Sequence, residues 1–384
     1  MTTIKKFLIY SNCLHNVFNF RGKLLESIAQ LGYEIHIVSP ILEKYAADHN
    51  ELINRGYHIH QIAMQRTGTN LVKDIKTFIN SYQLLNRIKP EYVLSYTVKP
   101  VVYGTLAAWL AGVSYRFVLF SGLGYTFQQV EETNKRSIFQ KFVHVLYQQA
   151  LAKSSKVFFQ NNDDLNLLKK LNIVHSMTPT VVVNGSGVDL NDFNVFPLPR
   201  HESGGVKSSF LLIARLLKDK GIVEYVEACK QIKREYPDAE FHLVGSIDEN
   251  PAAIEQAQLD QWISDGDIIY WGQVKDVRPA IAASSVYVLP SYREGTSRSV
   301  LEAMSMGRAI ITTDAPGCRE PVTNGINGYL VPVQAVTELI DAMRQFIEHP
   351  NLYEQMGSAS RVIAVDKYDV RKVNAHMIAE MGLE

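Results

Sequence analysis

The chain has 384 residues, of which 46% are hydrophobic and 20% charged, a composition typical of a globular protein with two or three domains. Lysine plus arginine and aspartate plus glutamate both number 39, so no excess of positive charge points to a nucleic-acid partner. The three cysteines lie far apart and predict neither a disulfide framework nor a metal cluster, which suits a reducing cytoplasm. The first residues enter a strand-like run with no signal-peptide pattern.

Strands and helices alternate through the first half of the chain. Strands are predicted at 7–10, 34–38, 58–63, 92–95, 116–120, 157–160 and 180–183. The clearest helices are expected at 21–31, which Gly32 closes, at 71–88 and at 137–152. The uncharged run from Val101 to Ser114 is too short and too interrupted to span a bilayer, so we interpret it as a buried helix leading into a buried strand.

A linker is predicted at 196–208, where prolines, glycines and polar residues show no hydrophobic period. The alternation then restarts with strands at 210–214, 240–244, 267–270, 286–289, 309–312 and 328–331. Helices are expected at 221–235, 252–264, 300–306, 336–348 and from 352 to 382. This order predicts two α/β domains with parallel sheets, at 1–195 and 209–365, and a C-terminal helix at 366–384 that packs back on the first domain.

Two carboxylates, Glu294 and Glu302, lie eight residues apart across a predicted junction from strand to helix. Open parallel sheets bind ligands at the carboxyl edge of their strands, where Glu294 would lie. The start of the helix, near residues 296–299, offers backbone N–H groups to an anion. Carboxylates beside an anion site suit hydroxyl groups, so the pattern suggests a sugar joined to a diphosphate.

Two cations, Arg215 and Lys220, follow the predicted strand at 210–214 and would leave the sheet at that same edge. A guanidinium and an ammonium group there could neutralise a diphosphate leaving group without a metal ion. Taken alone, they are more simply a basic turn that caps a helix. Together with Glu294 and Glu302, they favour a catalytic site.

These motifs resemble glycosyltransferase family 4, a set of retaining, nucleotide-sugar-dependent enzymes. The resemblance rests on three motifs in order: Ala214-Arg-Leu-x-x-x-Lys-Gly221, Glu294-x7-Glu302 and Thr312-Thr-Asp-Ala-Pro-Gly317. Ser95-Tyr-Thr-Val-Lys-Pro100 and Ser121-Gly-Leu-Gly-Tyr-Thr-Phe127 resemble the branch that adds hexosamines to polyprenyl-diphosphate-linked sugars. The fold that this resemblance implies is GT-B, an α/β fold of two Rossmann-like parallel-sheet domains facing across a cleft.

The resemblance also implies roles for individual residues. Arg215 and Lys220 would hold the donor diphosphate, Glu302 the ribose hydroxyls and Glu294 the donor sugar. Backbone N–H groups at the helix start would hold the distal phosphate, and the end of the strand at 267–270 would read the base, a uracil. The remaining donor-binding candidates are Gly245, Gln273, Val274, Thr296, Ser297, Arg298 and Ser299.

Arg298 and two further carboxylates, Glu320 and Asp189, each allow two interpretations. Arg298 precedes Glu302 by four residues, so the two could form a helical ion pair instead of a phosphate contact. Glu320 is either a carboxylate on a helix surface or a site residue. Asp189 either closes an interdomain turn or takes part in catalysis.

The first domain departs from the family pattern in two predicted loops. The loop at 11–22 lacks the glycine pair that many members carry, and Ser121-Gly-Leu-Gly124 stands where many carry a histidine. The catalytic group of this domain therefore stays open. Candidates by position, for the acceptor or for this group, are His15, Asn19, Arg21, Lys99, Gly122 and Gly124.

The segment from Lys135 to Lys156 is basic and amphipathic. It carries Lys135, Arg136, Lys141, Lys153 and Lys156 and no carboxylate. Such a helix either lies on an anionic membrane surface, as a lipid-linked acceptor would require, or packs on the core with a solvated basic face.

The sequence thus predicts a retaining hexosyltransferase that moves a sugar, by hypothesis an N-acetylhexosamine, from a UDP-sugar to a polyprenyl-diphosphate-linked saccharide. We expect it at the inner face of the plasma membrane, without a metal ion or other cofactor and without a nucleic-acid partner. Two alternatives stay open: a nucleotide-sugar 2-epimerase on the same fold, and a non-catalytic protein that binds at the membrane surface.

Overall fold

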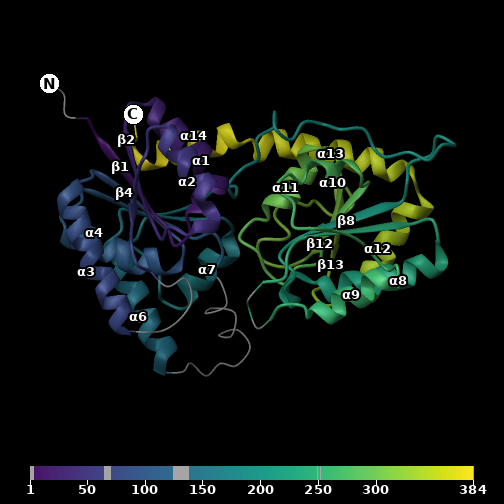
Figure 1. The fold of residues 1–384 in the computed structure, drawn as a ribbon, viewed down its shortest axis with the longest axis horizontal. Helices are drawn as coiled ribbons and strands as arrows, with labels where there is room; N and C mark the ends of the chain where they lie inside the picture. Colours follow the sequence, from purple (N-terminus) through teal and green to yellow (C-terminus); the bar gives the residue numbers. More distant parts are fainter. Residues whose placement is uncertain (1–3, 65–70, 124–137, 249, 251, 384) are drawn as a thin grey trace. The chain divides into compact units, whose positions relative to one another are not determined.

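The computed structural model describes the chain except residues 1–3, 65–70, 124–137, 249, 251 and 384. The chain divides into two compact units, Met1–Ser186 with Val373–Glu384, and Gly187–Lys372. Each unit contains a sheet in which the described strands all run parallel, with helices beside it (Figure 1). The predicted α/β class is therefore confirmed. Residues 196–208, suggested as a linker, lie within the second unit in this division.

The sheet of the first unit has the strand order β3-β2-β1-β4-β5-β6-β7 among the described residues. Its strands are β1 Lys6–Tyr10, β2 Glu34–Ser39, β3 His58–Gln61, β4 Tyr92–Tyr96, β5 Tyr115–Leu119, β6 Lys156–Phe159 and β7 Thr180–Val182. The helices are α1 Leu14–Gln30, α2 Ala46–Asn54, α3 Leu71–Ile88, α4 Thr105–Leu110, α6 Ile138–Ala152, α7 Asn162–Lys170 and α14 Val370–Met381. A short 3₁₀ turn, η1, spans Glu43–Tyr45.

Helices cover both faces of this sheet, because its central strands are apolar on both faces. In β1, Phe7 and Ile9 belong to a buried cluster with residues of α1 and α14, whereas Leu8 and Tyr10 belong to another cluster with residues of α3 and α4. Successive side chains of a strand point to opposite faces, so an uninterrupted apolar strand needs a partner on each side. The C-terminal helix α14 contributes Met377 to the first of these clusters.

The first helix begins seven residues earlier than the sequence suggested, at Leu14 rather than Arg21. Its buried residues include Leu14, Val17 and Leu24, which recur at helical spacing. The segment at 11–22, interpreted as a loop, is therefore mostly helix. His15, Asn19 and Arg21 consequently lie on α1.

Several other boundaries differ from those predicted. The buried helix expected from Val101 is a π-helical turn, η2 Pro100–Gly104, followed by the short α4. The strand expected at 58–63 ends at Gln61, and the one expected at 267–270 runs from Ile269 to Gly272. Within the part of the chain that the structure describes, no helix is both long enough and apolar enough to cross a membrane.

The sheet of the second unit has the strand order β10-β9-β8-β11-β12-β13 in the described chain. Its strands are β8 Ser209–Ile213, β9 Glu240–Val244, β10 Ile269–Gly272, β11 Val286–Leu289, β12 Ala309–Thr313 and β13 Gly328–Val331. The helices are α8 Ile222–Glu235, α9 Gln256–Ser264, α10 Arg278–Ala282, α11 Arg298–Ser305, α12 Val336–Glu348 and α13 Asn351–Lys367. A 3₁₀ turn, η3, spans Lys218–Lys220.

A buried arginine joins the segment at 196–197 to the rest of this second unit. The side chain of Arg308 is fully buried and donates hydrogen bonds to the carbonyl oxygens of Phe196 at 2.7 Å, Pro197 at 3.0 Å and Ile281 at 3.0 Å. Burial lowers the pKa of Arg308 to about 10, so the group still carries its charge at neutral pH. The bond to Ile281 O satisfies a buried carbonyl group, and the bonds to Phe196 and Pro197 attach their segment to the unit.

Candidate active site

The predicted donor-site residues gather at one edge of the second unit's sheet. Arg215 follows β8, Gly245 follows β9, Gln273 follows β10 and Glu294 follows β11. Because these strands are parallel, their carboxyl ends and the loops after them lie at the same edge. The structure thus brings to one edge the motifs that the sequence holds far apart.

Lys220 and Glu294 form the central ion pair of this edge. Lys220 Nζ lies 2.7 Å from Glu294 Oε1, and only 15% and 17% of the two side chains are exposed. Burial by itself lowers the pKa of Lys220, but the charge and hydrogen bond of Glu294 outweigh it and hold the pKa above its ordinary value. The pair therefore presents an ammonium group that is protonated at neutral pH at the ligand edge.

Backbone contacts fix the loop that carries Glu294. Its amide N–H donates to Pro316 O at 2.9 Å. Gly317 lies so close that a β-carbon there would stand 1.9 Å from Glu294 O, and its φ of +78° is left-handed. Only glycine fits both conditions without strain. The motif Thr312–Gly317 thus packs against the backbone of the Glu294 loop and fixes its position.

The helix α11 begins at this edge with its amino terminus. Ser297 is its N-cap residue, so the backbone N–H groups of Arg298 and Ser299 lie in the first turn and have no intrahelical acceptor. The Ser299 hydroxyl hydrogen-bonds to Tyr287 OH at 2.6 Å, and Thr296 Oγ1 donates to Gly295 O at 3.0 Å. First-turn N–H groups and the helix dipole make such a terminus suited to an anion.

Glu302 lies one turn into α11 and is 8% exposed. Arg298 Nε donates to Glu302 Oε1 at 2.8 Å, so the helical ion pair considered from the sequence is present. Burial raises the pKa of Glu302 above its ordinary value, although the charge and hydrogen bond of Arg298 oppose that effect. Glu302 is thus a buried acceptor held in place by one guanidinium group.

Arg215 lies at the same edge but has a different partner. Its Nη1 contacts Asp248 Oδ2 at 2.8 Å, and half of its side chain is exposed. Gln273 is exposed and Val274 is partly buried beside it. Asp248 was not anticipated from the sequence, because a single carboxylate in a loop carries no spacing signal.

The two remaining carboxylates with open interpretations have local contacts. Asp189 Oδ1 accepts from the backbone N–H of Asn191 at 3.0 Å and therefore caps its own turn. Glu320 lies in a turn and not on a helix surface, and its backbone oxygen accepts from Tyr368 OH at 2.9 Å.

The candidates on α1 of the first unit form a small polar group. His15 Nδ1 lies 2.6 Å from Asp48 Oδ2, and the His15 ring stacks on Tyr45 with centroids 4.7 Å apart. Asn19 Nδ2 lies 2.8 Å from His15 Nε2. Arg21 is instead buried, with its guanidinium carbon 5.1 Å from the centroid of the Tyr96 ring. His15 and Asn19 are thus brought together, while Arg21 packs within the unit.

Lys99 is held by a buried carboxylate that the sequence did not single out. Lys99 Nζ lies 2.7 Å from Asp74 Oδ1, and Tyr103 OH donates to Asp74 Oδ2 at 3.1 Å. Gly122 has a φ of +113°, a conformation that glycine adopts readily. Gly124 lies outside the described residues, as do Lys135, Arg136 and the side chain of Lys141 in the basic segment.

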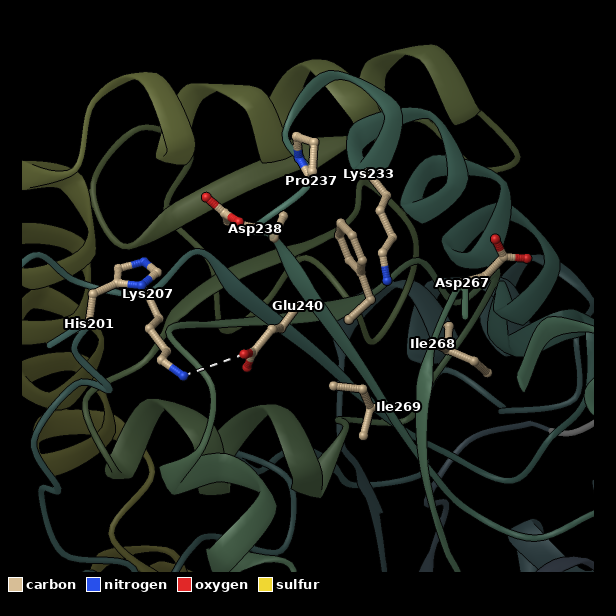
Figure 2. A pocket seen from close by; sticks show the side chains of 11 residues that line it. His201, Lys207, Lys233, Pro237, Asp238, Glu240, Asp267, Ile268 and Ile269 are labelled. Atoms are coloured by element: carbon tan, nitrogen blue, oxygen red, sulfur yellow. Dashed lines mark hydrogen bonds and ion pairs between the residues drawn. The ribbon is translucent and has the colours of Figure 1, made fainter. Parts of the chain in front are cut away.

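A pocket lies at the other edge of the second sheet, at the amino ends of β8, β9 and β10 (Figure 2). It has a volume of about 420 Å³, and Lys207 Nζ lies 3.4 Å from Glu240 Oε1 within it. The lining carries both charges, from Lys207 and Lys233 and from Asp238, Glu240 and Asp267. None of the predicted site residues lines it. In the described chain, no cluster of three or more His, Cys, Asp or Glu residues is placed to hold a metal ion.

Two α/β units, each with a parallel sheet, have the architecture of the GT-B fold, and the second carries a largely buried ion pair and a helix amino terminus at the carboxyl edge of its strands. Two family models match the chain: "Glycosyl transferase 4-like" over residues 10–161 and "Glycosyl transferases group 1" over residues 207–349. The chain belongs to glycosyltransferase family 4. The family and the transferase activity predicted from the sequence are confirmed.

Two bacterial relatives match over most of their length. The N,N'-diacetylbacillosaminyl-diphospho-undecaprenol alpha-1,3-N-acetylgalactosaminyltransferase of Campylobacter jejuni is 25% identical, and the match covers 88% of each chain. The UDP-Gal:alpha-D-GlcNAc-diphosphoundecaprenol alpha-1,3-galactosyltransferase of Escherichia coli is 29% identical over 71% of this chain and 70% of its own.

Solved structures share the fold at low sequence identity. Sucrose-phosphate synthase from Thermosynechococcus elongatus superposes with a TM-score of 0.76 at 16% identity and covers 98% of each chain. The Anabaena HepE protein in complex with UDP and glucose superposes with a TM-score of 0.74 at 18% identity, over 98% of this chain and 99% of its own. At these identities the likeness establishes the fold alone.

Proposed function

We propose that this glycosyltransferase moves a sugar, an N-acetylhexosamine, from a UDP-sugar to a polyprenyl-diphosphate-linked saccharide, with retention of the anomeric configuration. It would thereby act in the assembly of a bacterial polysaccharide. The observation that carries this proposal is the Lys220–Glu294 pair at the carboxyl edge of the second sheet, beside the amino terminus of α11.

Negative charge develops on the leaving diphosphate as the glycosidic bond breaks. In the proposal, the protonated ammonium group of Lys220 and the first-turn N–H groups of α11 stabilise that charge. Arg215, which is half exposed and now contacts Asp248, would turn to the same diphosphate. Charge neutralisation by these groups requires no metal ion or other cofactor.

The two carboxylates have separate roles in the proposal. Glu302, buried and fixed by Arg298, accepts hydrogen bonds from the ribose hydroxyls. Glu294 contacts the donor sugar and holds Lys220 in place. Gln273 and Val274, at the end of β10, would lie beside the uracil. A UDP complex of a protein with this fold supports this kind of donor.

The names of the two bacterial relatives support the proposed acceptor, a polyprenyl-diphosphate-linked saccharide. Both are named for transfer to saccharides on a diphosphate-linked undecaprenol, and both form an alpha-1,3 linkage. An alpha product is what retention yields from an α-linked nucleotide sugar. The sugars that they transfer differ, N-acetylgalactosamine in one and galactose in the other. The relatives therefore support the acceptor more specifically than they support the N-acetylhexosamine that we propose as the transferred sugar. We place the enzyme at the inner face of the plasma membrane, as a peripheral protein.

Purified protein incubated with a panel of UDP-sugars and undecaprenyl-diphosphate-linked acceptors tests the proposal. Mass spectrometry should detect an acceptor extended by one N-acetylhexosamine, and NMR should find an α-linkage. Transfer of a different sugar would overturn the donor assignment, and a β-linkage would overturn retention. Conversion of UDP-N-acetylglucosamine to an epimer without acceptor would replace the proposal with the epimerase alternative.

A further inference from the structure

Strands β8 and β11 separate at the carboxyl edge of the second sheet. Among the described residues, the ladder between them comprises two pairs, Phe210 with Val286 and Leu211 with Tyr287. Strand β8 continues beyond this ladder to Ile213. Because β9 and β10 lie on one side of β8 and β11, β12 and β13 lie on the other, the two strands flank the topological switch point of the sheet. Ligands of open parallel sheets bind at such a point.

Two hydroxyl groups bridge the strands where they separate. Tyr287 OH lies 3.0 Å from Ile213 O and 2.6 Å from Ser299 Oγ, and Ser299 Oγ lies 3.3 Å from Ile213 O. Tyr287 is fully buried. Two hydroxyl hydrogens suffice for this arrangement, since one hydroxyl donates to the carbonyl oxygen and accepts the hydrogen bond of the other. The last residue of β8 is thereby joined to the first turn of α11.

The first turn of α11 depends on this contact, because its N-cap residue does not fix it. An N-cap side chain usually accepts a hydrogen bond from an N–H group of the first turn. Ser297 holds the N-cap position, but its side chain makes no cap hydrogen bond. Its hydroxyl lies instead 3.2 Å from Ser299 Oγ. The direction of the first-turn N–H groups is therefore set by the contact between Ser299 and Tyr287.

We propose that Tyr287 is a positioning residue of the donor site, whose buried hydroxyl holds the first turn of α11 to the end of β8 and directs its N–H groups at the distal phosphate of the UDP-sugar. Since Ile213 precedes Arg215 by two residues, the same contact fixes the start of α11 relative to the backbone that carries this cation. The inference rests on the proposed function, because the distal phosphate belongs to the proposed donor.

Tyr287→Phe removes the hydroxyl group and keeps the ring. Hydrogen bonds weaken steeply as their angles depart from linear, so a displaced first turn should bind the distal phosphate less well. We expect the affinity for UDP to fall by about tenfold, while the affinity for UMP, which lacks that phosphate, should change by less than about twofold. Calorimetric titration of the full chain measures both affinities.

Tyr225→Phe is the matched control. Tyr225 is also fully buried, and its hydroxyl lies 3.0 Å from Phe210 O of β8 and 3.1 Å from His242 O of β9. These bonds join β8 to β9 and not to α11. The variant should lose about as much stability in urea unfolding as Tyr287→Phe, but it should keep the wild-type ratio of UDP affinity to UMP affinity.

Ser299→Ala tests the contact from its other side and decides the question if Tyr287→Phe does not fold. It should lower the ratio of UDP affinity to UMP affinity by about fivefold. The double variant Tyr287→Phe/Ser299→Ala should lower the ratio little more than Tyr287→Phe does, because both changes break the same contact. Steady-state kinetics of Tyr287→Phe should also show a lower kcat, since the same N–H groups meet the charge of the leaving diphosphate.

Unchanged UDP affinity in Tyr287→Phe, or an equal loss for UDP and UMP, would overturn the positioning role. An equal fall of the ratio in Tyr225→Phe would do the same, because the effect would then follow from any lost core hydroxyl. These outcomes leave the proposed function standing as long as the wild type prefers UDP to UMP. A wild type without that preference would count against the proposed donor itself, and with it against the role of Tyr287.

Discussion

Lys220 and Glu294 show how much a site depends on which side chains meet. Both residues were candidates from their motifs, but only the structure pairs them, at 2.7 Å and with little exposure. Asp48, Asp74 and Asp248, the partners of His15, Lys99 and Arg215, carry no signal in the sequence. Each is a single carboxylate whose place is decided by loop and helix packing.

Replacing Lys220 should impair catalysis more than it impairs folding. For Lys220→Ala we expect kcat for sugar transfer to fall by about 10²- to 10³-fold, because the leaving diphosphate loses this largely shielded cation. Steady-state kinetics with the UDP-sugar measures this. The matched control is Lys218→Ala, an exposed lysine of the same η3 turn, which should keep its activity. Equal rates in both variants would remove Lys220 from the reaction.

Donor affinity should depend on pH through Glu302. Burial raises its pKa, so its carboxylate takes up a proton at a higher pH than an exposed glutamate does. Affinity for UDP should therefore fall as the pH is lowered through this raised pKa, since a protonated carboxyl group is a poorer acceptor for ribose hydroxyls. Calorimetric titration of UDP across pH measures the effect.

Glu302 makes the free energy of unfolding depend on pH in the opposite direction to the affinity for UDP. A carboxyl group whose pKa is higher in the folded than in the unfolded state makes folding less favourable as the pH rises through the window between the two. Glu302→Gln should remove both dependences and bind UDP more weakly at neutral pH. If this variant retains the pH dependence of the wild type, another group is responsible.

At the scale of elements, the regular strands and helices follow from the pattern of apolar residues. The strand β11 Val286–Leu289 and the helices α3 and α12 have the predicted bounds. Helix α1 was predicted too short, because its N-cap residue Cys13 makes no side-chain cap and its first turns carry His15 and Asn16. Because the usual N-cap signal is missing at this position, the sequence does not show where the helix begins.

The loop that supports Glu294 depends on a glycine, which predicts a difference between two substitutions. Gly317→Ala should lower the free energy of unfolding by about 2–4 kcal/mol, from left-handed strain plus a clash with Glu294 O, and should reduce transfer. Gly266→Ala is the control, since its φ is +70° but nothing lies within 4 Å of the added carbon. It should cost only about 1 kcal/mol and spare activity. Urea unfolding measures both, and equal losses would contradict the role of the contact.

At the scale of the whole molecule, the order of elements predicted two parallel α/β units, and both are present. Their limits along the chain depend on contacts that periodicity does not report. Arg308 and Arg361 bind the carbonyl groups of residues 193–197, and this segment belongs to the second unit. Composition alone made the stretch from 196 look like a linker.

Removing the buried guanidinium group of Arg308 should destabilise the second unit. For Arg308→Leu we expect a loss of about 3 kcal/mol or more, because the buried carbonyl groups of Ile281 and Met306 lose this donor and the segment at 196–197 loses its attachment. In a Trp109→Phe background, tryptophan fluorescence during urea unfolding reports the second unit, where Trp262 and Trp271 lie. The control Arg234→Leu alters an exposed arginine of α8 and should change stability little. A similar loss in both would show that the buried bonds add nothing.

The sequence by itself determined the succession of strands and helices, the parallel sheets and the motif residues of the donor site. These depend on apolar periodicity and on short-range spacing, which any single segment carries. Only the tertiary structure decided that Lys220 meets Glu294, that Arg215 meets Asp248 and that Tyr287 meets Ser299. Such outcomes depend on how distant segments pack, because burial and pairing are properties of neighbours in space and not of neighbours in the chain.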